Sequence, residues 1–114
     1  MEIRRKEEIP GQLFDTCHDG EGTLECFSLL DGFDSKFFWY MHSDNMPAGV
    51  SIGEHLHTYF EEIYYLVSGT GVLTYDGVEQ PMSAGDVSLC TIGHSHGFKA
   101  TTDSVLIVVA PLVE

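Results

Sequence analysis

The sequence predicts an all-β fold, a sandwich or barrel built from short strands. Segments rich in aromatic and β-branched residues recur along the 114-residue chain, and Gly, Asp and Asn separate them. No segment has the period of an amphipathic helix. Many short strands at regular spacing are typical of β-sandwiches and barrels. At this length we expect a single domain.

The elements follow in order from these patterns. Residues 1–22 are polar and irregular, and we expect them to form an N-terminal arm ahead of one barrel domain over residues 23–114. Asp44-Asn45 is interpreted as a turn, and Asp76-Gly77 as the two-residue turn of a hairpin. The expected strands are residues 23–30, 37–43, 46–56, 59–67, 72–75, 78–82, 87–92, 96–101 and 104–110.

Two of these strands are apolar on both faces. Within residues 59–67, Tyr64 and Leu66 share one face while Tyr65 and Val67 share the other, and residues 105–109 are similar. A strand that is apolar on both sides is covered on both sides. The chain is too short to supply a second layer everywhere, so we predict a homodimer.

Composition excludes several classes of function. The formal net charge is −13 and only five residues are Lys or Arg, which disfavours nucleic acid and anionic membrane surfaces as partners. No apolar run has the length of a membrane span, and the first residues lack the apolar region of a signal peptide, so we expect a cytoplasmic protein. The odd, widely spaced cysteines Cys17, Cys26 and Cys90 argue against a disulfide framework.

Residues 49–69 carry the chemistry of the chain. His55 and His57 are two residues apart, so on a strand they project to the same face. Two neutral imidazoles on one face can share a transition-metal ion, with further ligands from a neighbouring strand. Taken alone, the pair is equally compatible with an exposed strand edge.

The wider spacing resembles the two motifs of the cupin superfamily. Gly49, His55, His57, Glu62 and Gly69 are spaced as in its first motif. Gly85, Thr91, Gly93 and His96 are spaced as in the second, and the short gap between the motifs resembles that of small single-domain cupins. The chain departs from the family at Thr91, where proline is usual, and at Ala100, where asparagine is usual.

The resemblance implies a double-stranded β-helix, or jelly-roll, barrel with one divalent transition-metal ion. It implies four ligands, His55, His57, Glu62 and His96, with Glu61 as the rival carboxylate. Such a set leaves coordination positions open for a substrate, and it accepts Zn, Mn, Fe or Ni. The resemblance also offers an alternative for the N-terminal arm, a strand that pairs with a second subunit.

Other polar residues are weaker candidates. Tyr64 shares the face of Glu62 and is expected to line the pocket as a catalytic residue. His94 is a second catalytic candidate at the pocket mouth, or else a turn residue. His42 is interpreted as a core histidine, with a supporting base as the alternative, and His18 as a bystander. Lys99 should point outward, so the pocket is expected to be poor in cations other than its metal.

These residues favour a metal-dependent enzyme acting on a small-molecule substrate, neutral or weakly anionic. Isomerase or lyase chemistry on sugar-like or keto compounds ranks level with dioxygenase chemistry, because both use a metal to bind adjacent oxygens. The alternatives are a non-catalytic module that binds a small ligand or a metal, and a barrel with a vestigial site. Fold alone does not decide among them.

Overall fold

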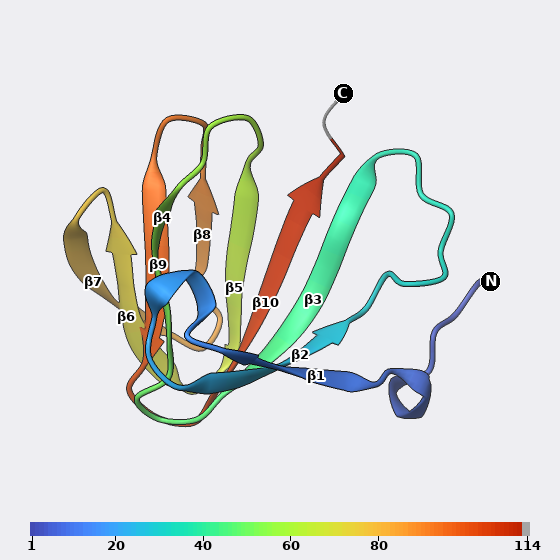
Figure 1. The fold of residues 1–114 in the computed structure, drawn as a ribbon, viewed down its shortest axis with the longest axis horizontal. Helices are drawn as coiled ribbons and strands as arrows, with labels where there is room; N and C mark the ends of the chain where they lie inside the picture. Colours follow the sequence, from blue (N-terminus) through green and yellow to red (C-terminus); the bar gives the residue numbers. More distant parts are fainter. Residues whose placement is uncertain (113–114) are drawn as a thin grey trace.

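Two antiparallel sheets form the structure, a computed structural model that describes residues 1–112 (Figure 1). The prediction of an all-β fold is confirmed. The six-stranded sheet has the order β1-β2-β3-β10-β5-β8 and the four-stranded sheet the order β4-β9-β6-β7. The strands of the first are β1 Gly11–Asp15, β2 Thr23–Ser28, β3 Phe38–Met46, β10 Ser104–Pro111, β5 Glu62–Ser68 and β8 Val87–Cys90. Those of the second are β4 Ser51–Leu56, β9 Ser95–Ala100, β6 Thr70–Tyr75 and β7 Val78–Ser83.

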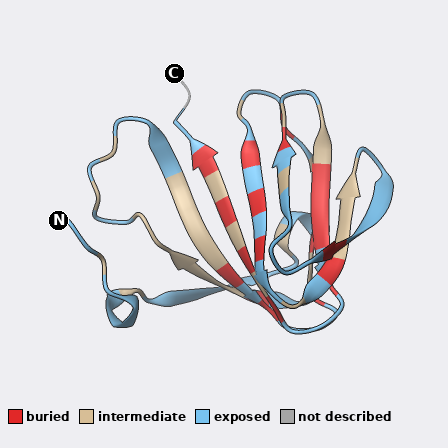
Figure 2. Cartoon of the chain, turned by 180° about the vertical axis from the view of Figure 1, so that it is seen from behind, coloured by how far each residue is buried: buried red, intermediate tan, exposed pale blue. Residues whose placement is uncertain are grey.

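The core lies between the inward faces of the two sheets. Along β5 and β10 every second residue is buried, which is the period expected of a strand with one face against a core (Figure 2). The largest buried side chains include Tyr64, Leu66 and Leu106 from the large sheet and Phe98 from the small one. The outward residues of β5 are exposed within a single chain.

The predicted hairpin at Asp76-Gly77 is confirmed. Tyr75 pairs with Val78 across the turn, and both central residues have positive φ, 50° and 77°. Positive φ at both positions is the type I′ geometry, whose twist matches the twist of the flanking strands.

The expected turn at Asp44-Asn45 is wrong. Both residues lie inside β3, where Asp44 pairs with Cys26 on one side and Leu106 on the other. Turn propensity is a local preference, and here pairing on both sides satisfies the backbone and overrides it. The buried carboxylate of Asp44 therefore points into the molecule rather than into a surface turn.

Residues 1–22 are also more regular than expected. Gly11–Asp15 forms the edge strand β1, which pairs with β2 of the same chain. All five side chains of β1 are exposed, so the segment has no alternation that a sequence pattern could reveal. The two helical segments, η1 Lys6–Glu8 and η2 Cys17–Asp19, are short 3-10 turns. Among the described residues, no helix has the length and hydrophobicity that crossing a membrane requires.

The turn η2 lies directly against β4. A side chain on Gly53 would place its Cβ 2.0 Å from the carbonyl oxygen of His18, so the two backbones touch at a point where only glycine fits. Three residues around η2 adopt positive φ without being glycine: Thr16, His18 and Asp19. The N-terminal segment is thus held over the strand that carries His55.

Candidate metal centre

Four side chains from both sheets converge at one end of the core. His55 lies in β4 and His96 in β9, and the two are direct cross-strand partners. His57 follows the end of β4, and Glu62 is the first residue of β5 in the other sheet. All four residues predicted as ligands are therefore brought together, from positions as far apart as 55 and 96 in the chain.

The donor atoms of these residues face one another. His96 Nε2 lies 2.9 Å from Glu62 Oε1 and 2.9 Å from His57 Nε2. Glu62 Oε1 lies 3.5 Å from His57 Nε2 and 3.9 Å from His55 Nε2. Three imidazole nitrogens gathered around one carboxylate oxygen fit a transition-metal ion, because each can direct a lone pair to a common centre.

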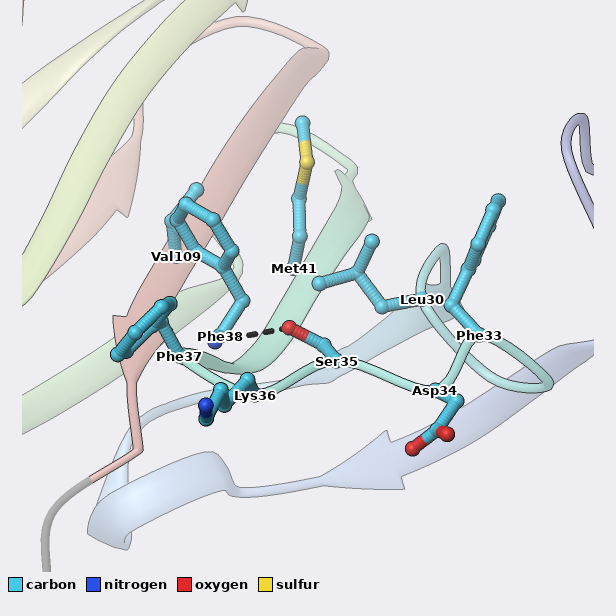
Figure 3. A pocket seen from close by; sticks show the side chains of 9 residues that line it. All are labelled: Leu30, Phe33, Asp34, Ser35, Lys36, Phe37, Phe38, Met41 and Val109. Atoms are coloured by element: carbon cyan, nitrogen blue, oxygen red, sulfur yellow. Dashed lines mark hydrogen bonds between the residues drawn. The ribbon is translucent and has the colours of Figure 1, made fainter.

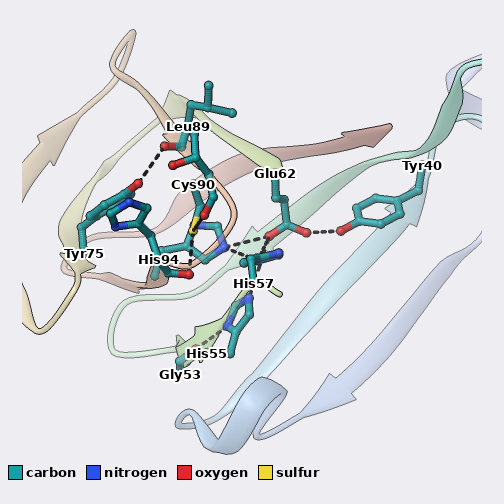
Figure 4. Close-up of polar contacts among 11 residues, drawn as sticks. Tyr40, Gly53, His55, His57, Glu62, Tyr75, Leu89, Cys90 and His94 are labelled. Atoms are coloured by element: carbon teal, nitrogen blue, oxygen red, sulfur yellow. Dashed lines mark hydrogen bonds and ion pairs between the residues drawn. The ribbon is translucent and has the colours of Figure 1, made fainter. Parts of the chain in front are cut away.

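Outer contacts orient two of these ligands, His55 and Glu62. His55 Nδ1 donates to the carbonyl oxygen of Gly53 at 2.8 Å, which leaves Nε2 as the lone-pair nitrogen. The hydroxyl of Tyr40 donates to Glu62 Oε2, the oxygen that faces away from the histidines (Figure 4). The Nδ1 atoms of His57 and His96 are buried and have no hydrogen-bond partner within residues 1–112. Such outer partners fix the tautomer and rotamer of metal ligands.

The electrostatics of the cluster favour an ionised carboxylate. Burial alone would raise the pKa of Glu62, but contacts with His55, His96 and Tyr40 outweigh burial and hold this pKa well below its ordinary value. Burial, and then the hydrogen bond to Glu62, raise the pKa of Tyr40. The cluster thus presents an anionic oxygen next to a neutral phenol, which is the charge state that a cation requires.

The two candidate carboxylates, Glu61 and Glu62, differ in exposure. The Glu62 side chain is buried and lies within the cluster, whereas Glu61 is exposed. Glu62 begins β5 on its inward face, where every second residue is buried, whereas Glu61 precedes the strand.

A small cavity of about 110 Å³ adjoins the cluster. A water molecule occupies about 30 Å³ of liquid, so this space suits a ligand of a few heavy atoms. None of its lining residues is Lys or Arg within the described chain, which agrees with the cation-poor pocket that we predicted. The lining consists of Cys17, His18, Tyr40, His42, Asp44, Ile52, His55, Glu62, Tyr64 and Val108.

Two histidines lie closer to the site than the sequence indicated. His18, expected to be a bystander, stacks on His55 with ring centroids 3.7 Å apart. His42, expected in the core, has a side chain 24% exposed and lines the cavity. The sequence did not indicate Asp44 or Cys17 as residues of the site, nor the contact between Tyr40 and Glu62. The polar residues at every second position, 40, 42 and 44, would have indicated a strand that continues through Asp44 with these side chains on one face.

The two catalytic candidates occupy different places. Tyr64 is buried in the cavity wall and stacks on His96 with centroids 4.0 Å apart, and its hydroxyl has no partner within residues 1–112. Burial, and then the charge of Glu62, raise the pKa of Tyr64, so its phenol is neutral. His94 lies in the turn before β9 and pairs through Nδ1 with Asp76 Oδ2 at 2.5 Å, outside the cavity lining. Their catalytic roles stay predictions.

Acidification is expected to release a bound metal. Ligand histidines must be neutral, so protons compete with the metal below the ordinary imidazole pKa of about 6.5. Burial lowers the pKa of His55, but its contacts with Glu62 and the Gly53 carbonyl outweigh burial and raise it. Occupancy should therefore be highest above pH 7 and fall steeply towards pH 5. Metal retained after equilibrium dialysis at each pH measures this, and constant occupancy down to pH 5 would contradict it.

Comparisons with known proteins point to one family. A family model described as Cupin domain matches residues 43–111. The chain is 31% identical over 113 residues to an oxalate-binding protein of Thermotoga maritima, covering 97% of this chain and 93% of the other. The crystal structure of a Thermotoga maritima protein, described as a predicted oxalate decarboxylase, superposes with a TM-score of 0.88 at 30% identity, covering 97% and 99% of the two chains. A conserved barrel protein from Salinispora arenicola gives 0.72 at 27%, covering 96% and 87%.

Proposed function

The chain belongs to the cupin family, and from that premise we propose that it is a metal-dependent enzyme acting on a small sugar-like or keto/enol compound. The observation that carries the proposal is the convergence of three imidazoles and one carboxylate beside a cavity of about 110 Å³. The cluster would hold one divalent transition-metal ion through His55, His57, Glu62 and His96. Such an ion supplies Lewis-acid polarisation of a ligand oxygen.

The chain's own residues would prepare the site for this chemistry. Tyr40 and Gly53 orient Glu62 and His55 through hydrogen bonds. The neutral Tyr64 hydroxyl, which is buried and has no partner within residues 1–112, would donate to a ligand oxygen. The apolar residues Ile52 and Val108 limit the room for water in the cavity. Isomerase or lyase chemistry and dioxygenation are both compatible with this arrangement.

A non-catalytic binding module is the second candidate. The name of the Thermotoga relative, an oxalate-binding protein, favours it. Oxalate is a small compound that presents adjacent oxygens, and a ligand of that size suits the cavity. In this case the same site would hold a ligand without changing it.

Calorimetric titration of the metal-loaded protein with oxalate and with small hydroxy and keto acids tests the proposal. Binding should depend on the metal and disappear after chelation, whereas equal binding with and without metal would contradict it. Proton NMR of each ligand during long incubation then separates the candidates. Conversion of a ligand supports the enzyme, and binding of every tested ligand without conversion supports the binding module.

We also propose that the protein is a homodimer that joins through the outward face of the large sheet. Apolar side chains on this face are exposed along two adjacent strands, β5 and β8: Ile63, Tyr65, Val67, Val87 and Leu89. An apolar hollow of about 500 Å³ continues the face past β10, lined by residues that include Phe37, Phe38 and Met41 (Figure 3). A contiguous apolar face of this kind is characteristic of an interface.

A charge placed on this face should separate the subunits. We expect wild-type protein to sediment at about twice the mass of one chain and Tyr65→Lys to sediment as a monomer. The matched control is Val78→Lys in β7 of the other sheet, where the side chain is also exposed. A monomeric wild-type protein, or a Tyr65→Lys dimer as stable as wild type, would contradict the proposal.

A further inference from the structure

A stripe of polar side chains runs along the inward face of β3. Tyr40, His42 and Asp44 alternate along the strand, so all three point into the molecule, and all three line the cavity. The stripe begins at the metal cluster, where Tyr40 donates to Glu62, and continues away from it. His42 stacks on Tyr40 with ring centroids 5.1 Å apart. The cavity therefore has a second polar wall, formed by His42 and Asp44.

Asp44 fixes the orientation of His42. The Asp44 side chain is 2% exposed, and its Oδ1 lies 2.9 Å from His42 Nδ1. An ionised carboxylate only accepts hydrogen bonds, so Nδ1 carries the proton that is donated to it. In the neutral ring, Nε2 then carries a lone pair. The pair thus presents a hydrogen-bond acceptor to the cavity.

The charges around this wall disfavour a second anionic group on the ligand. Asp44 contributes a carboxylate to this wall, whereas the charge of Glu62 would be offset by the bound ion, and none of the residues described as lining the cavity is Lys or Arg. The thiol of Cys26 faces Asp44 across the β2–β3 pair. Burial, and then the charge of Asp44, raise the pKa of Cys26 to about 12, so this thiol stays neutral. A ligand carboxylate placed here would meet like charge, whereas a hydroxyl would find an acceptor.

We propose that His42, oriented by Asp44, accepts a hydrogen bond from a hydroxyl group of the ligand. The inference rests on the proposed function and narrows it, because it assigns the ligand to the small 2-hydroxy acids and 2-hydroxy carbonyl compounds. Two adjacent oxygens of such a ligand would bind the metal held by the cluster, and its hydroxyl group would donate a hydrogen bond to His42. A fully ionised dicarboxylate such as oxalate satisfies only the first of these contacts.

Cys26, His42 and Asp44 also place possible donor atoms within 4.8 Å of one another, which raises a second metal site as the alternative. A metal there would require the neutral thiol of Cys26 to lose its proton. It would also replace the hydrogen bond between His42 and Asp44. The observed contact therefore favours a ligand-binding pair, and a second ion becomes an outcome of the experiment.

Calorimetric titration with glycolate and methoxyacetate tests the inference on metal-loaded protein. Both compounds offer adjacent oxygens, but a methyl ether replaces the hydroxyl in methoxyacetate. Wild type should bind glycolate roughly tenfold more tightly, which is the scale of one hydrogen bond to a partly buried group. In His42→Phe, which keeps a planar ring, this ratio should fall to about one. His42→Gln should retain part of it, because the amide oxygen can still accept.

Three further readouts separate the possible failures. Equal affinities of wild type for the two compounds, or an unchanged ratio in His42→Phe, would overturn the inference alone if oxalate still binds in a metal-dependent way. Failure to bind any of the three compounds would overturn the proposed function with it. Two ions per wild-type chain and one in His42→Phe would assign the pair to a second metal. Circular dichroism confirms that each variant is folded.

Discussion

Replacing His96 with alanine is expected to abolish stoichiometric metal binding. His96 is fully buried, and its Nε2 lies 2.9 Å from both Glu62 Oε1 and His57 Nε2, so it stands at the centre of the cluster. Loss of an outer hydrogen-bond partner alone typically weakens metal affinity by about 10–100-fold. Loss of the ligand itself should exceed the upper end of this range. Elemental analysis of protein purified without chelators should find about one ion per wild-type chain and almost none in the variant.

The matched control for this experiment is Glu61→Ala. Glu61 precedes a cluster residue, yet its side chain is exposed. The Glu61→Ala variant should retain one ion per chain. Added metal should raise the midpoint of thermal unfolding of wild type and Glu61→Ala but not of His96→Ala, because a ligand of the folded state stabilises it by mass action. Metal loss in Glu61→Ala with retention in His96→Ala would contradict the assigned site.

The second large effect is expected at Gly69, in the turn between β5 and β6. Gly69 has φ of +89°, and a Cβ there would lie 2.3 Å from Ser104 Oγ and 2.5 Å from the carbonyl oxygen of Asp103. Alanine at positive φ costs about 1–2 kcal/mol. The overlap with a neighbouring backbone should add about 1–3 kcal/mol. Gly69→Ala should therefore strongly lower the free energy of unfolding measured by urea titration.

Gly49→Ala isolates the steric part of this effect. Gly49 also has φ of +89°, but a Cβ there would have no atom within 4 Å. Both variants change the unfolded chain in the same way, so that contribution cancels in the comparison. Gly49→Ala should lower the free energy of unfolding only by the cost of alanine at positive φ. Equal losses in the two variants would show that backbone conformation, and not crowding by residues 103 and 104, requires glycine at position 69.

The four-residue cluster could be predicted because the spacing of its members along the sequence is characteristic. The period of a strand predicted one face for His55 and His57, and the motif spacing supplied Glu62 and His96. The strands whose side chains alternate between core and surface, such as β5 and β10, could be predicted for the same reason. Both signals are spacings between residues, so both can be recognised in the sequence without knowledge of the fold.

The second wall of the cavity could not be predicted in the same way. His42 and Asp44 matter because of a contact between them and a cavity whose other side is formed by residues from distant strands. Asp44-Asn45 also imitates a turn in its local composition. His18 reaches His55 only because η2 folds back onto Gly53, an approach that no periodicity encodes. Long-range contacts of this kind depend on topology rather than on residue type.

The position of the cluster has a mechanical consequence. His55 and His96 belong to the four-stranded sheet and Glu62 to the six-stranded one, so a bound ion would join the two layers as a crosslink. Opening of the layers away from each other would then require ligand bonds to break, and amide hydrogen exchange in β4, β5 and β9 should slow together when the metal is loaded. The stability of the closed sandwich would thus rise with the concentration of free metal.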